Sequence, residues 1–166
     1  PDDIALRCNL VTLQGDGGIN TLMEDFAAGH ITNSEAEEII SDLNQTMSTH
    51  DIRFYPGVSY RHVMVLKNGA AHFINIEKLE LTPPHDIIGR AILPFLPKAG
   101  GECILSWMKE SQDLLKDHPV NLTRKANGLR PANSIWLWGQ GRLPQMIPLK
   151  KRFGIEGFVI SAVHLL

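Results

Sequence analysis

The chain has 166 residues, of which 43% are hydrophobic and 20% are charged, and its formal net charge at pH 7 is −2. A chain of this length forms one domain that buries roughly 70% of its unfolded surface. The small negative charge argues against nucleic acid or an anionic membrane as a partner, because phosphate groups require a dominant basic field. Cys8 and Cys103 are too few for a disulfide framework and favour a reducing, cytoplasmic setting.

The two ends of the chain predict a piece of a longer protein. No apolar run approaches the roughly 18 residues of a membrane span, and the Pro-Asp-Asp start is not a signal peptide. The chain begins at Pro1 without a methionine and ends just after the apolar run 157–163. Natural domains usually fray into polar tails. We therefore expect all of 1–166 to be a single domain excised from a longer protein.

The first strand is predicted over 4–13, followed by a glycine-rich turn. Arg7 and Asn9 alternate there with apolar side chains, which indicates either an edge strand with one wet face or a polar face kept for a ligand. The turn 14–18 lacks the Lys-Ser/Thr pair of a phosphate-binding loop. We therefore interpret it as a hairpin turn.

Capping signals and apolar spacing predict four helices. The first begins with a capping box formed by Thr32 and Glu35, and its apolar stripe continues to Met47. A second amphipathic helix is predicted over 102–116. Two shorter helices are predicted, one following the polar corner 82–89 and one over 148–153, with Gly154 as its C-terminal cap.

A β-hairpin is predicted from the alternating segment 58–66, the Asn68-Gly69 pair and a return strand over 71–76. Arg61 and His62 are neighbours on the first strand of this hairpin. They should point to opposite faces unless a bulge intervenes.

A rigid polar corner at 82–89 presents His85 and Asp86. A histidine beside a carboxylate can act as a general base, but no serine or cysteine nucleophile motif accompanies the pair. No metal-ligand spacing completes a metal site either. The alternatives for Asp86 are contact with a ligand and a helix cap.

The stretch 121–141 combines a buried-strand pattern with polar groups that could bind a ligand. It holds the apolar strand 134–138, which we expect to be buried on both faces. Polar groups lie at the two ends of this strand, and arginine matches carboxylate and phosphate oxygens two at a time. The stretch predicts either a small anionic ligand or, alternatively, buried tryptophans with solvated arginines. The candidate ligand contacts are Arg124, Arg130, Asn133 and Gln140.

The order of the elements predicts an α/β fold. The strand 134–138, the short helix and the apolar run 157–163 form a compact βαβ pattern, so the two strands should be parallel. Together with the earlier hairpin, this predicts a three-layer α/β/α architecture with a mixed, mostly buried sheet.

Six short motifs, distributed from end to end of the chain, resemble one known family. They are IALRCNL at 4–10, AGHI at 28–31, YPGVSYRH at 55–62, PPHD at 83–86, HPVN at 118–121 and RPANSIWLWGQG at 130–141. The family is the archaeal-type 2,3-bisphosphoglycerate-independent phosphoglycerate mutases, isomerases of glycolysis in the alkaline phosphatase superfamily. Some bacterial relatives are similar to proposed homoserine kinases instead.

The resemblance covers the inserted substrate-binding lobe of that family. It implies that a missing phosphatase-like core carries the nucleophilic serine and two divalent metal ions (Mn, Mg or Zn). It therefore implies no catalytic residue, metal ligand or cofactor within this fragment. The partners that it implies are phosphoglycerate and the missing core. The implied substrate contacts are Arg7, Arg61, His62, His85, Asp86, Arg124, Arg130, Asn133 and Gln140.

Two other functions remain open from the sequence. One is the lobe of a homoserine kinase-like phosphotransferase, which keeps the fold and changes the substrate. The other is a non-catalytic interaction domain, which would have no phosphatase-like core beside it.

Overall fold

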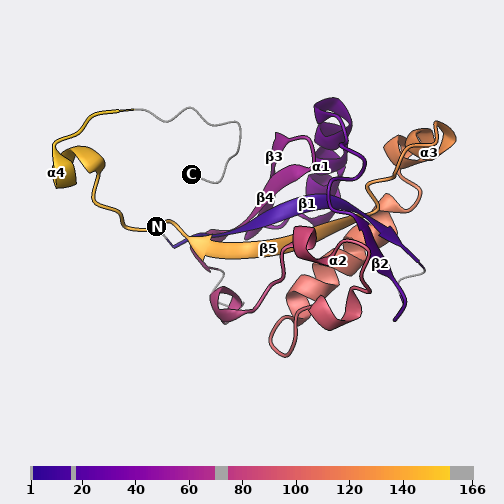
Figure 1. Ribbon diagram of the computed structural model, residues 1–166, viewed down its shortest axis with the longest axis horizontal. Coiled ribbons are helices and arrows are strands. Elements are labelled where there is room, and N and C mark those ends of the chain that lie inside the picture. Colours follow the sequence, from indigo (N-terminus) through magenta and orange to yellow (C-terminus); the bar gives the residue numbers. More distant parts are fainter. Residues whose placement is uncertain (1, 16–17, 70–74, 158–166) are drawn as a thin grey trace.

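The computed structural model of the chain describes residues 2–15, 18–69 and 75–157. A single β-sheet is flanked by helices, and a separate arm leaves the body after the last strand (Figure 1). No helix among the described residues is long and apolar enough to cross a membrane. The strands are β1 (Ile4–Gln14), β2 (Leu22–Asp25), β3 (Ile52–Val58), β4 (Arg61–Leu66) and β5 (Ser134–Arg142).

Strand β1 is the centre of the sheet. It pairs with β4 on one side and with β5 on the other, so that Cys8 lies opposite both His62 and Leu137. β3 continues the sheet beyond β4, and β2 pairs with the end of β1. The expectation of an edge strand is therefore wrong, since β1 has partners on both sides.

The α/β class is confirmed, but the pairing differs from the mixed sheet that we expected. All four pairings among the five named strands are antiparallel, including that of β5 with β1. The chain passes through α2 and α3 and then forms β5, which runs antiparallel to β1 (Figure 1). The expected parallel strand 157–163 lies, apart from its first residue, outside the described residues.

Two long helices cover one face of the sheet. α1 (Asn33–Met47) packs on β3, α2 (Glu102–Leu115) packs on β5, and the two helices contact each other. Among the described residues, the opposite face carries irregular chain rather than a second helical layer. The Trp136 indole N–H attaches this irregular chain to the sheet by donating to the Thr82 carbonyl. This irregular chain contains short 3₁₀ turns at Ile76–Lys78, Pro84–Ile87 and Leu93–Phe95.

The capping signals place the long helices correctly. Thr32 accepts a hydrogen bond from the Glu35 backbone N–H, and the Glu35 carboxylate accepts one from the Thr32 backbone, so the predicted capping box is formed. α2 has the predicted bounds to within one residue. α4 (Leu149–Phe153) ends at Gly154, whose φ of 69° is the left-handed conformation of a C-terminal cap.

Helix α3 (Pro119–Ala126) was not predicted. His118 caps it by accepting a hydrogen bond from the Val120 N–H, and Pro119 occupies its first turn. Histidine is not among the usual capping residues, and eight residues give little apolar periodicity. Where a short helix was expected after the corner 82–89, the structure has the 3₁₀ turn Leu93–Phe95, and the corner itself contains the 3₁₀ turn Pro84–Ile87.

The β4 strand does form a hairpin, but it pairs with the preceding strand β3, whereas the prediction paired it with a following return strand. The observed hairpin joins β3 to β4, and its turn contains Ser59, whose φ is 54°. The Ser59 hydroxyl donates to the Ile31 carbonyl and its N–H donates to Asn33, so contacts from a distant segment hold this turn. Asn68-Gly69 lies in a 3₁₀ turn, Lys67–Gly69. Residues 71–74 of the expected return strand lie outside the described residues, and Ile76 begins another 3₁₀ turn.

Candidate functional site

A pocket of about 630 Å³ opens on the sheet face opposite the long helices. It collects side chains from β1, β4, β5 and the turn Pro84–Ile87, and five of the nine predicted contacts line it. These five are Arg7, Arg61, His62, His85 and Asp86. The other pocket residues are Asn9, Gly57, Val58, Tyr60, Val63 and Trp138.

The register of the central strands brings the two pocket arginines to one face. Asn9 lies opposite Arg61 on β4, while Arg7 lies opposite Val63 on β4 and Trp138 on β5. Directly opposed residues of antiparallel strands share a face. Arg7 and Arg61 are therefore near neighbours although they lie 54 positions apart in the sequence.

Arg7 is held against an aromatic ring and has no anionic partner. Its guanidinium carbon lies 4.8 Å from the centre of the Trp138 ring. Trp138 is fixed in turn by its indole N–H, which donates to Asn9 Oδ1 at 3.0 Å. Among the described residues, no carboxylate or carbonyl accepts a hydrogen bond from the Arg7 guanidinium, so its donors are available to a ligand.

Arg61 also has no carboxylate partner among the described residues. Its guanidinium carbon lies 5.2 Å from the centre of the Tyr60 ring. Its Nε is buried without a hydrogen-bond partner in the described structure. Two guanidinium groups without carboxylate partners in one pocket create a local positive field on a protein whose net charge is −2.

His62 is a neutral hydrogen-bond donor with a fixed tautomer. Its Nδ1 accepts the Gly57 N–H at 3.1 Å, so the ring proton resides on Nε2. Nε2 is buried and has no partner among the described residues. Burial lowers the pKa of His62 to about 4, so the ring is uncharged at neutral pH. β4 pairs with β1 in continuous register, with Asn9 opposite Arg61 and Cys8 opposite His62, so these two neighbouring side chains point to opposite faces of the sheet as predicted, although both residues line the pocket.

His85 is packed between aromatic rings rather than paired with its neighbour. Its ring centre lies 4.4 Å from that of Phe26 and 5.4 Å from that of Trp138. Burial lowers the pKa of His85; Asp86 opposes this shift and Arg7 adds to it. No hydrogen bond joins His85 to Asp86 in the described structure, so a general base with an orienting carboxylate is not assembled here. Asp86 does not cap the turn either, because no side chain caps it.

Arg124 is a structural residue away from this pocket. It is 3% exposed and donates three hydrogen bonds, to the carbonyls of Ala28 and Arg130 and to the carboxylate of Glu35. Burial by itself raises the pKa of Glu35, but hydrogen bonds from Thr32 and the contact with Arg124 outweigh it and lower the pKa. Arg124 therefore joins the start of α1 to α3 and leaves no donor directed at the pocket.

The remaining predicted contacts also bind the protein itself. Arg130 pairs with Glu24 at 2.9 Å and with Asp25 at 3.4 Å. Asn133 exchanges two hydrogen bonds with the backbone of Leu13. Gln140 donates to the Leu79 carbonyl. The structure thus does not bring these residues to the pocket that Arg7 and Arg61 share.

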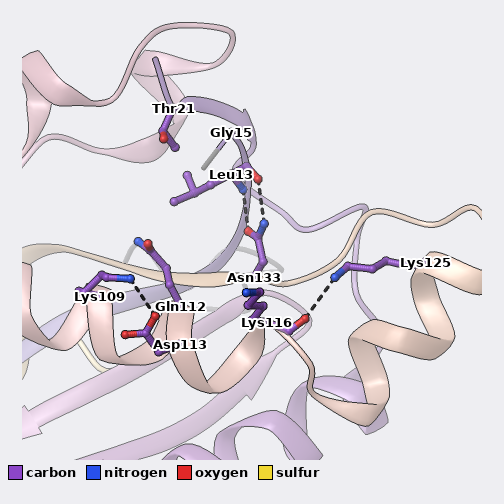
Figure 2. A pocket seen from close by; sticks show the side chains of 9 residues that line it. All are labelled: Leu13, Gly15, Thr21, Lys109, Gln112, Asp113, Lys116, Lys125 and Asn133. Carbon is purple, nitrogen blue, oxygen red and sulfur yellow. Dashed lines mark hydrogen bonds and ion pairs between the residues drawn. The ribbon is translucent and has the colours of Figure 1, made fainter. Parts of the chain in front are cut away.

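Asn133 lies in a different hollow, beside α2 and α3 (Figure 2). Its volume is about 430 Å³. Its charged groups are largely satisfied internally: Lys109 pairs with Asp113 at 2.8 Å, and the Lys125 ammonium donates to the Lys116 carbonyl. This hollow therefore has less free positive charge than its lysines suggest.

Asn9, Tyr60 and Trp138 were not among the predicted ligand contacts. Trp138 was assigned to packing, and it does pack, but its ring also supports Arg7 at the pocket. The polar alternation of β1 was the available sequence signal for Asn9. The pairing of β5 with β1, which brings Trp138 to Arg7, has no local signal in the sequence.

The described residues contain no group of three or more His, Cys, Asp or Glu side chains placed to hold a metal ion. The pocket is thus a hollow lined by two arginines and by aromatic rings on a lobe of the α/β class.

The comparisons with known proteins identify the family. Residues 1–121 match the family model described as 2,3-bisphosphoglycerate-independent phosphoglycerate mutase. The chain is 45% identical over 166 residues to the protein of that name from Methanosarcina mazei and 44% identical over 165 residues to that from Methanothrix thermoacetophila. These matches cover 99% of this chain. The chain therefore belongs to the 2,3-bisphosphoglycerate-independent phosphoglycerate mutase family.

The chain spans only 39% and 38% of the lengths of these two relatives. A solved structure, the cofactor-independent phosphoglycerate mutase from Thermoplasma acidophilum, has the same fold, with a TM-score of 0.62 at 22% identity. That match covers 90% of this chain and 39% of the solved one.

Proposed function

We propose that the chain is the substrate-binding lobe of a phosphoglycerate mutase, which interconverts 3-phosphoglycerate and 2-phosphoglycerate in cytoplasmic glycolysis. One observation carries this proposal: Arg7 and Arg61 line one pocket and have no anionic partner among the described residues. By contrast, Arg124, which serves the structure, is paired with the carboxylate of Glu35. Unpaired guanidinium groups beside aromatic rings are suited to a ligand that brings its own negative charge.

The chemistry of the pocket matches a phosphoglycerate. The ligand carries a phosphate and a carboxylate, and two guanidinium groups supply paired donors for these oxygens. The single carboxylate of Asp86 at the same pocket suits the ligand's hydroxyl group, because an ionised carboxylate accepts hydrogen bonds and repels anions.

In this proposal the chain binds and orients the substrate, and the rest of a longer enzyme performs the phosphoryl transfer. The divalent metals and the serine nucleophile would belong to that remainder. Closure of the lobe over the substrate would exclude water and protect a phosphorylated enzyme from hydrolysis.

The test is a binding titration of 3-phosphoglycerate, with the full-length enzyme as the reference. We expect NMR shifts in this chain at Arg7, Arg61 and His62 and none at Arg124 or Arg130. In the full-length enzyme, Arg61→Met should reduce kcat/KM for 3-phosphoglycerate by at least about 100-fold, because an interaction with charged oxygens is lost. Arg53→Met, on the exposed side of β3, is the matched control. Equal effects of the two substitutions would refute the assignment.

A further inference from the structure

Asn9 lies between the two pocket arginines and is buried beneath them. Arg7 precedes it on the same face of β1, and Arg61 lies directly opposite Asn9 on β4, so the three side chains share one face of the sheet. Only 2% of Asn9 is exposed. A side chain buried to this extent has almost no surface left for a ligand, so Asn9 acts on the pocket through the residues that it holds.

The two ends of the Asn9 amide hold two aromatic residues. Its oxygen accepts the Trp138 indole N–H at 3.0 Å, and its nitrogen donates to the Phe26 carbonyl at 3.2 Å. An indole N–H can only donate and a carbonyl can only accept, so these partners fix the orientation of the amide. Asparagine supplies a donor and an acceptor at this position, whereas an ionised aspartate would supply acceptors alone.

Each of these aromatic residues leads to one of the arginines. The Trp138 ring lies under the Arg7 guanidinium, 4.8 Å from its central carbon. The Phe26 ring packs edge-on against Tyr60, with 5.5 Å between the ring centres. The Tyr60 ring in turn lies under the Arg61 guanidinium, 5.2 Å from its central carbon. One buried amide is therefore connected to both guanidinium groups through aromatic rings.

The two residues that Asn9 holds are also joined to each other. The His85 ring contacts both, with its centre 4.4 Å from that of Phe26 and 5.4 Å from that of Trp138. Two guanidinium groups without anionic partners repel each other, so they need a fixed support to stay close together before a ligand binds. The rings provide this support, and Asn9 is the polar group that holds them to the sheet.

We propose that Asn9 is a positioning residue that sets the spacing of Arg7 and Arg61 to fit a ligand with two anionic groups. This inference rests on the proposed function, which supplies the phosphate and the carboxylate of 3-phosphoglycerate as those groups. Fixed donors lose less freedom when a ligand binds, so the spacing strengthens binding of a matching ligand. A ligand with one anionic group gains less, because it can use only one guanidinium group fully.

The test compares two ligands of the full-length enzyme. Glycerol 3-phosphate has the phosphate of 3-phosphoglycerate and lacks its carboxylate, so its inhibition constant measures binding through one anionic group. In Asn9→Leu we expect KM for 3-phosphoglycerate to rise about tenfold with kcat unchanged, because binding alone is weakened. The inhibition constant of glycerol 3-phosphate should change by less than about twofold. An unchanged KM, or equal losses for the two ligands, would overturn the inference.

Asn44→Leu is the matched control, at a partly buried asparagine that serves the structure. Asn44 on α1 exchanges two hydrogen bonds with the backbone of Phe54. Its replacement should lower the free energy of unfolding and leave KM for 3-phosphoglycerate unchanged. A rise in KM as large as that in Asn9→Leu would show a general effect of the fold and would overturn the inference.

Trp138→Phe tests the inference even where Asn9→Leu does not fold. It keeps a ring beside Arg7 and removes the N–H that Asn9 accepts, so KM should rise about fivefold, as expected for one lost hydrogen bond. Combining it with Asn9→Leu should raise KM little beyond the value for Asn9→Leu alone, because both changes remove the same link. An unchanged KM in Trp138→Phe would overturn the inference.

A measurement without substrate separates this inference from the proposed function. The Trp138 ring current shifts the resonances of the Arg7 Cδ protons, which NMR detects in the full-length enzyme with ¹³C-labelled arginine. Asn9→Leu should remove most of this shift, and Asn44→Leu should preserve it. Loss of the shift, in an enzyme whose wild type does not act on 3-phosphoglycerate, would contradict the function and support the positioning role. An active enzyme in which the shift persists in Asn9→Leu would do the reverse.

Discussion

The guanidinium of Arg7 lies over the indole of Trp138, with 4.8 Å between the guanidinium carbon and the ring centre, and Gly139 makes this contact possible. A Cβ at Gly139 would lie 3.2 Å from Arg7 Cδ, and the φ of Gly139 is 58°. The stem of Arg7 therefore passes over a residue without a side chain. The sequence Trp138-Gly139 supplies both the ring that holds the arginine and the space that it occupies.

Arg7→Lys should weaken 3-phosphoglycerate binding by about tenfold or more, although it preserves the positive charge. Lysine lacks the planar fork that binds two oxygens and stacks on an indole. Isothermal titration on the full-length enzyme measures this effect. Arg53→Lys on β3 is the control, and an equal loss in both variants would contradict a specific role for Arg7.

His62 should make the stability of the fold depend on pH. Burial lowers its pKa from 6.5 to about 4, so the unfolded chain takes up the proton before the folded chain does as the pH falls. Its contribution to stability is complete above about pH 6.5 and is lost as the pH falls to about 4. This loss is at most about 3 kcal/mol.

Urea denaturation between pH 7 and pH 4.5 measures this dependence. His62→Asn preserves an acceptor for the Gly57 N–H and removes the titrating group, so its stability should change less over this range. Glu35, whose pKa is lowered, loses its contribution only as the pH falls below about 4.5 and is present in both proteins. Parallel pH profiles for the two proteins would show that His62 does not titrate as described.

Gly57→Ala should destabilise the protein and disturb the pocket together. A Cβ at Gly57 would lie 2.1 Å from the Arg61 carbonyl oxygen, so the β3 bulge must move. We expect a loss of about 2–4 kcal/mol in the free energy of unfolding. Gly141→Ala is the control, because no atom lies within 4 Å of its added Cβ. Circular dichroism during urea unfolding compares the two variants, which should not have equal midpoints.

Arg124→Met should reduce stability without changing 3-phosphoglycerate binding. It leaves the Glu35 carboxylate and two carbonyl groups without their donor, at a cost of about 3 kcal/mol. Arg130→Met removes ion pairs in which the arginine side chain is 53% exposed, and should reduce stability much less than Arg124→Met does. Weaker 3-phosphoglycerate binding in variants that remain folded would show that these two arginines contact the ligand.

The features that were predicted correctly have local causes. The capping box of Thr32 and Glu35 and the apolar period of 102–116 are contained within a few turns of chain, so the sequence alone places α1 and α2. The position of the hairpin turn was predicted wrongly, because Asn68-Gly69 has the stronger local turn signal. Ser59 is instead held in the turn by Ile31 and Asn33, which lie far away in the sequence.

The candidate site was predicted in the same uneven way. Arg7, His62 and Asp86 all line one pocket. Arg124 and Arg130 have the same side chain as Arg7, and only the fold reveals that carboxylates from β2 and α1 already neutralise them. Residue type suggests which groups can bind an anion, but pairing across the fold decides which of them are free to do so.

The hydrogen bond between Arg142 and Asp2 has a consequence for protein engineering. β1 begins beside the point at which β5 ends, so a short glycine linker could join these two strands. New chain ends could then be opened in an exposed loop elsewhere. Such a circular permutant would retain every strand pairing. The body could equally be transplanted as a cassette into a host loop whose ends are a strand spacing apart.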